Sequence, residues 1–227
     1  MSVAQQDVDA LVAYCRNTLG EQELWIEPEG YPSSLALCLI DSIYSTGSHY
    51  RSVVNVVIRY RAAHGHNDGA AALLQSMAAA GGACGWAETV ADNLKPAHTK
   101  PGALLKAEVI QQAARLMVDH NIDTVEELVA VVRASPTDNP IHNAWKTLPS
   151  QRSGVTYSYL LLLAGLPSVK PDRMVLRFLQ QALGTDAELT TGRASELVMA
   201  AAGRLGVSPR SLDHVIWRVV SGREATG

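Results

Sequence analysis

The stretch LPSQRSGVTYSYLLLLAGLPSVKPDRMVLRFLQQAL, residues 148–183, decides the expected fold. It opens with a short polar turn over 148–154 and continues in an apolar run over 157–164 that is long enough for a buried helix. Pro171 predicts the start of a second helix, because the first position of a helix does not need the N–H group that proline lacks. Asp172 then lies in the first turn of that helix. The stretch therefore predicts a turn followed by two helices, the second with an aspartate at its start.

The rest of the chain carries the same helical signal. Apolar residues recur with the spacing of amphipathic helices, and glycine, proline and capping residues separate the segments. We expect further helices over residues 7–19, 34–45, 50–63, 70–80, 86–94, 101–120, 124–132, 141–147, 189–205 and 209–220. Thr124 and Glu127 have the spacing of a capping box, in which each side chain accepts a backbone N–H of the other residue. Together these patterns predict an all-α fold.

Composition and charge are typical of a globular chain. Of the 227 residues, 47% are hydrophobic and 18% are charged, which supports a sizeable core and argues against disorder. The net charge of −3 argues against a protein that coats nucleic acid through its overall charge, although a local basic face can still bind. No apolar run reaches membrane-spanning length, and the opening residues MSVAQQ have neither the basic nor the apolar region of a leader. We therefore expect a cytoplasmic protein with no membrane partner.

The sequence lacks motifs for cofactors and metals. Cys15, Cys38 and Cys84 are widely spaced, as expected of reduced, packed thiols in a cytosolic protein. His64 and His66 lie together in a polar loop, but no nearby Cys or further His completes a ligand set. The chain also has no Walker loop, no dinucleotide fingerprint and no GxSxG nucleophile motif. We predict neither a cofactor nor a metal.

The order and spacing of the segments resemble those of the helix–hairpin–helix DNA glycosylase superfamily, which contains endonuclease III, the adenine glycosylases and the alkylated-base glycosylases. In that family a hairpin of the form LPGVG precedes a buried helix, a loop and an aspartate that begins the next helix. LPSQR at 148–152 matches the hairpin, and Asp172 falls on the family's aspartate without a gap. KAEVI at 106–110 is similar to the family's helix before the hairpin. SLALCLIDSIYSTG at 34–47 is similar to its first core helix.

The resemblance implies a two-lobed helix–hairpin–helix fold with the active cleft between the lobes. An N-terminal helix and loop over residues 1–36 would pack on the terminal lobe. Residues 37–143 would form the middle helical lobe, and residues 144–227 would hold the hairpin and the C-terminal helices. The implied partner is double-stranded DNA, and the expected state is a monomer.

The implied activity is that of a monofunctional DNA glycosylase. Cleavage of an N-glycosidic bond builds positive charge on the sugar, and a fixed carboxylate stabilises that charge or activates water. The resemblance assigns this role to Asp172. The alternative is structural, because an aspartate in the first turn of a helix commonly interacts with the positive end of the helix dipole. Gly154 stands where bifunctional members carry a lysine nucleophile, so no Schiff base can form and lyase activity should be absent. No cysteine follows Cys84, so the four-cysteine iron–sulfur cluster of several relatives cannot form.

The resemblance also places four residues around an extruded base. Asp41 lies on the helix that lines the base pocket in the family, where it would bind the base or position water; the alternative is a cap for a neighbouring helix. Tyr44 would stack in the gap that the base leaves, and Trp145 would form a platform beside the hairpin. For both aromatic residues, a place in the core is the alternative. Gly154 would leave room for a bulky base, or would simply suit the start of a helix.

Phosphate contacts are expected at the hairpin and around the family aspartate. The residues assigned to DNA binding are Ser150, Gln151, Arg152, Ser153, Lys170 and Arg173. A second basic group consists of Lys95, Lys100 and Lys106, and solvated surface charge is the alternative for both groups. The hairpin departs from the family pattern, because Ser150 and Arg152 replace its glycines.

The expected substrate is a damaged or modified base. Extrusion of a base costs roughly a few kcal/mol, and a poorly stacked base lowers that cost. Repair of damaged bases and removal of bulky modified bases from phage DNA, as antiviral defence, are both open. The alternative function is a catalytically inactive DNA-binding or protein-interaction module with the same fold. A third interpretation is a soluble helical domain with another role.

Overall fold

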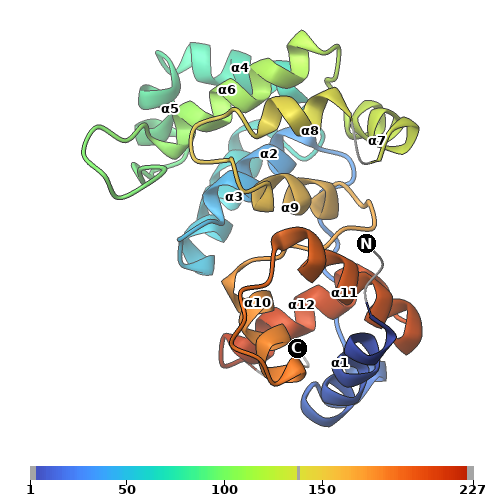
Figure 1. Ribbon diagram of the computed structural model, residues 1–227. Helices are drawn as coiled ribbons and strands as arrows, with labels where there is room; N and C mark the ends of the chain where they lie inside the picture. The colour runs from blue at the N-terminus through green and yellow to red at the C-terminus, as the bar shows by residue number, and fades with distance from the viewer. Residues whose placement is uncertain (1–3, 137–138, 224–227) are drawn as a thin grey trace. The chain divides into compact units, whose positions relative to one another are not determined.

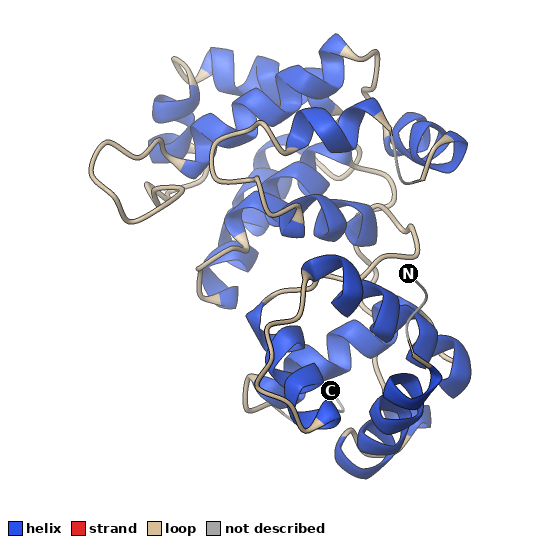
Figure 2. Ribbon diagram, in the orientation of Figure 1, coloured by secondary structure: helices blue, strands red, loops and turns tan. Residues whose placement is uncertain are grey.

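The structure is a computed structural model that describes residues 4–136 and 139–223 (Figure 1). Within these residues the regular elements are helices, and no strand is found (Figure 2). The helices are α1 (Gln5–Thr18), a short 3₁₀ helix (Gln22–Leu24), α2 (Leu35–Tyr44), α3 (Tyr50–His64), α4 (Ala70–Ala79), α5 (Ala83–Thr89), α6 (Lys106–Asp119), α7 (Val125–Ala134), α8 (Pro140–Trp145), α9 (Val155–Leu163), α10 (Arg173–Leu183), α11 (Thr191–Leu205) and α12 (Pro209–Val220). The all-α prediction is confirmed.

Some expectations extend beyond the described residues or concern the membrane. Part of the expectation for MSVAQQ rests on residues 1–3, and the expected C-terminal segment includes residues 224–227; both lie outside the described ranges. None of the helices that the structure describes is both long enough and apolar enough to cross a membrane.

The capping box of α7 is present, since Thr124 Oγ1 accepts the N–H of Glu127 at 3.2 Å and the Glu127 carboxylate accepts the N–H of Thr124 at 2.9 Å.

Two helices differ most from the expected bounds. The helix expected over 101–120 begins at Lys106, because the residue before it pairs its backbone with Pro96 in an isolated antiparallel bridge. The helix expected over 86–94 is α5, which begins and ends earlier. The backbone of Asp92 has a φ of 46°, which is incompatible with a continuing right-handed helix.

The chain divides into two compact units. The larger unit is Gly30–Leu166, and the smaller unit joins Met1–Glu29 to Pro167–Gly227. The hairpin and α9 therefore belong to the larger unit, whereas the sequence analysis grouped them with the C-terminal helices over 144–227. The physical reason is burial, because Trp145 before the hairpin and the apolar face of α9 lie in the core of the larger unit.

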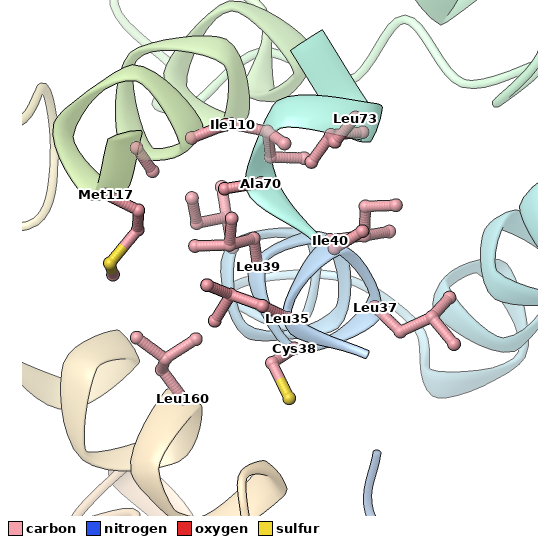
Figure 3. Packing of buried hydrophobic residues seen from close by; sticks show 14 of the residues in the cluster. Leu35, Leu37, Cys38, Leu39, Ile40, Ala70, Leu73, Ile110, Met117 and Leu160 are labelled. Carbon is pink, nitrogen blue, oxygen red and sulfur yellow. The ribbon is translucent and has the colours of Figure 1, made fainter. Parts of the chain in front are cut away.

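Helix α2 forms the centre of the larger unit. All 10 of its residues are buried, and it contacts α3, α4, α6 and α9. Figure 3 shows its apolar side chains among Leu73 of α4, Met117 of α6 and Leu160 of α9. A helix that is apolar on every face is stable in water only when other elements surround it. Helices α3, α4, α6 and α9 are therefore arranged around α2.

A buried helix also needs partners for the free backbone groups at its ends. At the N-terminus, Ser34 Oγ accepts a backbone N–H at 3.2 Å and donates to the carbonyl of Asp68 at 2.9 Å. At the C-terminus, Nζ of Lys106 donates to the carbonyls of Ile43 and Tyr44 at 3.0 and 2.9 Å. Lys106 is 2% exposed, so it is a helix cap and not a member of the basic group expected to contact phosphate.

The smaller unit is built from α1, α10, α11 and α12. Its core is formed by apolar side chains from all four helices, among them Val12, Phe178, Leu197 and Val215. Ion pairs join α1 to α11 at the surface, where Arg193 binds Asp7 and Arg204 binds Asp9. The termini of the described chain thus belong to one folded unit.

Replacement of Lys106 by methionine should destabilise the protein by about 3 kcal/mol, because buried carbonyl groups at the end of α2 then lose their donor. Methionine keeps the length of the side chain but not its charge. Lys100→Met, at an exposed position, is the matched control and should change the free energy of unfolding by less than about 0.5 kcal/mol. Denaturant unfolding followed by circular dichroism measures both. Equal stability of the two variants would contradict the capping role of Lys106.

Candidate functional site

The hairpin of the larger unit consists of two consecutive turns between α8 and α9. The N–H of Gln151 donates to the carbonyl of Leu148, and the N–H of Gly154 donates to the carbonyl of Gln151, each at 3.0 Å. The helix before the hairpin ends at Trp145, two residues earlier than the expected 141–147 helix. The predicted order of helix, short turn and buried helix is present.

Ser150 has a backbone conformation that favours glycine. Its φ is 65°, in the left-handed region, where a residue with a Cβ atom is less stable than glycine by about 1–2 kcal/mol. The family pattern LPGVG carries glycine at the matching place, whereas this chain carries serine. The conformation is therefore present without the residue that favours it, and other contacts must hold the turn.

Those contacts are a buried chain of hydrogen bonds. Nε1 of Trp145 donates to Oγ1 of Thr156 at 2.9 Å, and that hydroxyl donates to Oε1 of Gln151. Nε2 of Gln151 in turn donates to the carbonyl of Pro149 at 3.1 Å. Gln151 is 3% exposed, which corrects its assignment to DNA contact. Its side chain holds the turn from inside and is not available to a phosphate.

The remaining hairpin residues point to solvent. Ser150, Arg152 and Ser153 are exposed. Within the described part of the chain, the N–H groups of Arg152 and Ser153 have no hydrogen-bond acceptor. Successive free N–H groups in a turn form an anion-binding surface. The hairpin therefore presents both a guanidinium group and backbone donors to an anionic ligand.

The backbone conformation at position 154 explains why the residue there is glycine. Gly154 is the residue before α9 and has a φ of 75°, in the left-handed region. A Cβ atom built on it would meet only Nε2 of His142, at 3.9 Å, which is ordinary contact. The sequence left two interpretations, room for a bulky base or a residue suited to the start of a helix. The second accounts for this glycine and requires no ligand.

Two residues expected around the base lie in the core instead. Tyr44 is fully buried, and its hydroxyl donates to the carbonyl of Asn93 at 3.1 Å. Trp145 is also fully buried and bonded to the hairpin. Neither ring has an exposed face on which a base could stack, so both assignments to the base pocket are corrected. Tyr44 is enclosed because α2 is buried along its whole length, and Trp145 is enclosed in the core of the larger unit.

Asp41 is a buried carboxylate on α2. It is 7% exposed, and its Oδ2 accepts a hydrogen bond from the hydroxyl of Tyr31 at 2.8 Å. Burial and, to a smaller extent, the charge of Asp41 raise the pKa of Tyr31, so that hydroxyl stays a donor. The guanidinium of Arg61 lies 5.1 Å from the centre of the Tyr31 ring. This cluster is polar and partly enclosed, and Asp41 stays a candidate for base recognition.

In the smaller unit, Asp172 is the N-cap of α10, one residue before the first turn in which we expected it. Its Oδ1 accepts the N–H groups of Met174 at 2.8 Å and Val175 at 3.3 Å. Pro171 consequently precedes the helix and does not occupy its first position. Within the described residues, Oδ2 of Asp172 accepts no hydrogen bond. The carboxylate is thus fixed through one oxygen at a helix N-terminus.

Asp213 of α12 is a candidate that the sequence analysis missed. It is 7% exposed, and its Oδ1 accepts the N–H of Lys170 at 2.9 Å. The carbonyl of Lys170 in turn accepts the N–H of Asp172 at 2.7 Å. Burial raises the pKa of Asp213 to about 7, against the hydrogen bond and charge of Lys170, and the charge of Asp172 adds to the rise. The available signal was an aspartate directly after Leu212, on the buried side of the helical period.

The structure brings some of the expected residues together within each unit. The smaller unit holds Asp172, Lys170 and Arg173 along one short segment, with Asp213 bonded to it. Arg173 is exposed, and Lys170 is half-buried. The larger unit holds the hairpin residues and Asp41.

Other polar features lie away from the expected residues. An open groove of about 470 Å³ on the larger unit runs along α6 from Gln111 to His120 and reaches Ala144 of α8. Nε2 of His64 is hydrogen-bonded to Oγ of Ser76 at 2.8 Å, so this histidine is not simply part of a solvated loop. In the ranges that the structure describes, no three His, Cys, Asp or Glu side chains are grouped to hold a metal ion.

Replacement of Ser150 by glycine should stabilise the protein by about 1 kcal/mol, because glycine adopts a positive φ without strain. Ser153→Gly, at an exposed hairpin position without a positive φ, is the matched control and should lower stability slightly. Thermal and denaturant unfolding measure the difference. A stability loss in both variants would show that the backbone at Ser150 is not strained.

Asp213→Asn should gain stability relative to the wild type as the pH rises from about 4 to about 7. The raised pKa means that the folded protein keeps a proton that the unfolded chain has released in this range, so the wild type loses stability with rising pH. The change should reach about 4 kcal/mol at most, since each pKa unit corresponds to about 1.4 kcal/mol. Asp186→Asn, at an exposed position, is the control. A pH-independent difference between wild type and Asp213→Asn would contradict the raised pKa.

Comparison with known proteins gives one match that spans both units. The model of the family described as Domain of unknown function (DUF8548) matches residues 9–221. No curated protein and no solved structure matches the chain. The family match covers all the candidate residues, from Asp41 to Asp213. The chain belongs to the family Domain of unknown function (DUF8548).

Proposed function

We propose that the protein is a monofunctional DNA glycosylase, which extrudes a damaged or modified base from duplex DNA and hydrolyses its N-glycosidic bond. The observation that carries this proposal is the geometry of Asp172. One carboxylate oxygen caps α10 through two N–H groups, and the other accepts no hydrogen bond within the described chain. A carboxylate that is fixed through one oxygen and open at the other suits the stabilisation of positive charge on a sugar.

Asp172 would act as the leaving base departs. The sugar then develops the positive charge of an oxocarbenium ion, and a nearby carboxylate lowers the energy of that state or removes a proton from the attacking water. The cap contributes by holding the carboxylate in one orientation, so little reorganisation is needed in the transition state. Gly154 has no side chain to form an imine with the sugar, so the product would be an intact abasic strand.

The hairpin would bind the DNA backbone. Arg152 supplies a positive charge, and the free N–H groups of Arg152 and Ser153 supply donors for phosphate oxygens. These contacts position the duplex but read no sequence. They also allow a protein with a net charge of −3 to bind DNA through a local surface.

The proposed substrate is a base that is already poorly stacked. Such a base lowers the unstacking energy that extrusion requires. Alkylated, oxidised and enzymatically enlarged bases all belong to this class. Among them, the bulky modified cytosines of phage genomes would make the protein a defence enzyme instead of a repair enzyme.

The second candidate function is a DNA-binding or protein-interaction module that has no catalytic activity. Two observations favour it: the hairpin lacks the glycines of the family pattern, and Asp172 already has a structural task as a helix cap. Such a module would bind duplexes that carry damaged or modified bases without removing any base. The two candidates therefore differ in a single assay of excision.

Asp172→Asn should lower base excision by at least ~100-fold while folding and DNA affinity change little. Asparagine caps helices about as well as aspartate, so the substitution removes the charge and keeps the cap. The assay incubates duplexes that carry one alkylated, oxidised, deaminated or bulky modified base, then adds alkali to cleave abasic strands. Asp186→Asn, an exposed aspartate in the same unit, is the control.

Three results are decisive, one from the excision assay, one from a duplex-binding measurement and one from borohydride trapping. Excision by Asp172→Asn at the wild-type rate would leave Asp172 as a helix cap alone. Duplex binding by the wild type without excision of any base would favour the non-catalytic module. Efficient trapping of a protein–DNA complex by borohydride would contradict the hydrolytic mechanism without an imine.

A further inference from the structure

A buried carboxyl group in the smaller unit is connected to the proposed catalytic residue through two hydrogen bonds and the backbone of Lys170 between them. Helices α10 and α12 pack against each other (Figure 1). From α12, Oδ1 of Asp213 accepts the N–H of Lys170 at 2.9 Å, and the carbonyl of Lys170 accepts the N–H of Asp172 at 2.7 Å. The carboxylate of Asp172 then accepts two N–H groups at the start of α10. Asp213 thereby holds the segment that carries Asp172.

We propose that Asp213 is a positioning residue for Asp172 in the excision reaction, an inference that rests on the proposed glycosylase function. Its carboxylate accepts the N–H of Lys170, and the carbonyl of the same residue accepts the N–H of Asp172, so two hydrogen bonds fix the backbone on either side of the Lys170 Cα. An ionised acceptor roughly doubles the strength of the bond between Asp213 and the N–H of Lys170. Ionised Asp213 also adds negative potential near Asp172, where the sugar would become positive.

The charged groups around Asp213 come from one segment. Lys170 and Asp172 act on it, and both precede α10. The charged residues of the two helices packed against α12 are exposed, whereas Asp213 is buried: Arg173 and Arg177 on α10, and Arg193, Glu196 and Arg204 on α11. The charges that act on the pKa of Asp213 therefore lie on the same segment that its carboxyl group holds.

Stability and activity should respond to Asp213 with opposite signs. Burial without full compensation favours the neutral form, so ionised Asp213 destabilises the fold at and above neutral pH. Groups whose charge is unfavourable for stability often occur in active sites, where that charge orients or stabilises the reacting groups.

The test measures single-turnover excision from about pH 5.5 to about pH 8.5, with protein in excess over the duplex that the wild type cleaves best. The wild-type rate should rise by about tenfold through the region of the raised pKa of Asp213, near pH 7. Asp213→Asn should have a flat profile and be about tenfold slower than the wild type at pH 8, with duplex affinity within about twofold. At that pH it should unfold at a higher temperature than the wild type. Asp186→Asn should keep the wild-type profile.

The possible failures can be told apart. If Asp213→Asn keeps the wild-type rate and pH profile, the positioning role is wrong while the glycosylase function stands. If Asp213→Asn is slower but also less stable than the wild type at pH 8, Asp213 is a structural residue and the inference is overturned. If the wild type excises no base from any duplex in the panel, the proposed function fails, and this inference fails with it.

Discussion

The larger unit depends on the burial of α2 along its whole length. Its apolar side chains leave no face for solvent, so other helices must cover it on every side. Burial also removes water from the ends of the helix, where backbone groups have no partner within the helix. Ser34 and Lys106 supply those partners, and Lys106 does so with a charged group from a helix more than 60 residues away along the chain. The position of α6 is thus linked to α2 through a polar contact as well as through packing.

The hairpin shows how side chains can maintain a strained turn. Ser150 adopts a conformation that glycine would adopt more easily, and the neighbouring residues hold it there. The indole of Trp145, the hydroxyl of Thr156 and the amide of Gln151 form a buried chain that closes the turn from inside. Since the buried side chains fulfil this task, the outer surface with Arg152 is free to bind a ligand.

In the smaller unit, the same residues have both a structural role and a proposed catalytic role. Asp172 caps α10, and Asp213 holds the backbone that leads to this cap. The raised pKa of Asp213 means that its ionisation works against the fold at neutral pH. Groups whose charge lowers stability are often found at functional sites. The unfavourable charge of Asp213 therefore supports the proposal that the segment before α10 carries function.

The sequence by itself determined the features that depend on neighbours along the chain: the helical periods, the capping box at Thr124, the turn before α9 and the aspartate at the start of α10. Helix ends were less predictable, because the backbone pairing before α6 and the turn at Asp92 depend on distant or unusual contacts. Only the tertiary structure decided that Lys106, Tyr44 and Gln151 are buried, since a period identifies the apolar face of a helix but not what covers it. The bond between Asp213 and Lys170 joins residues 43 positions apart, and no local pattern in the chain encodes such a contact.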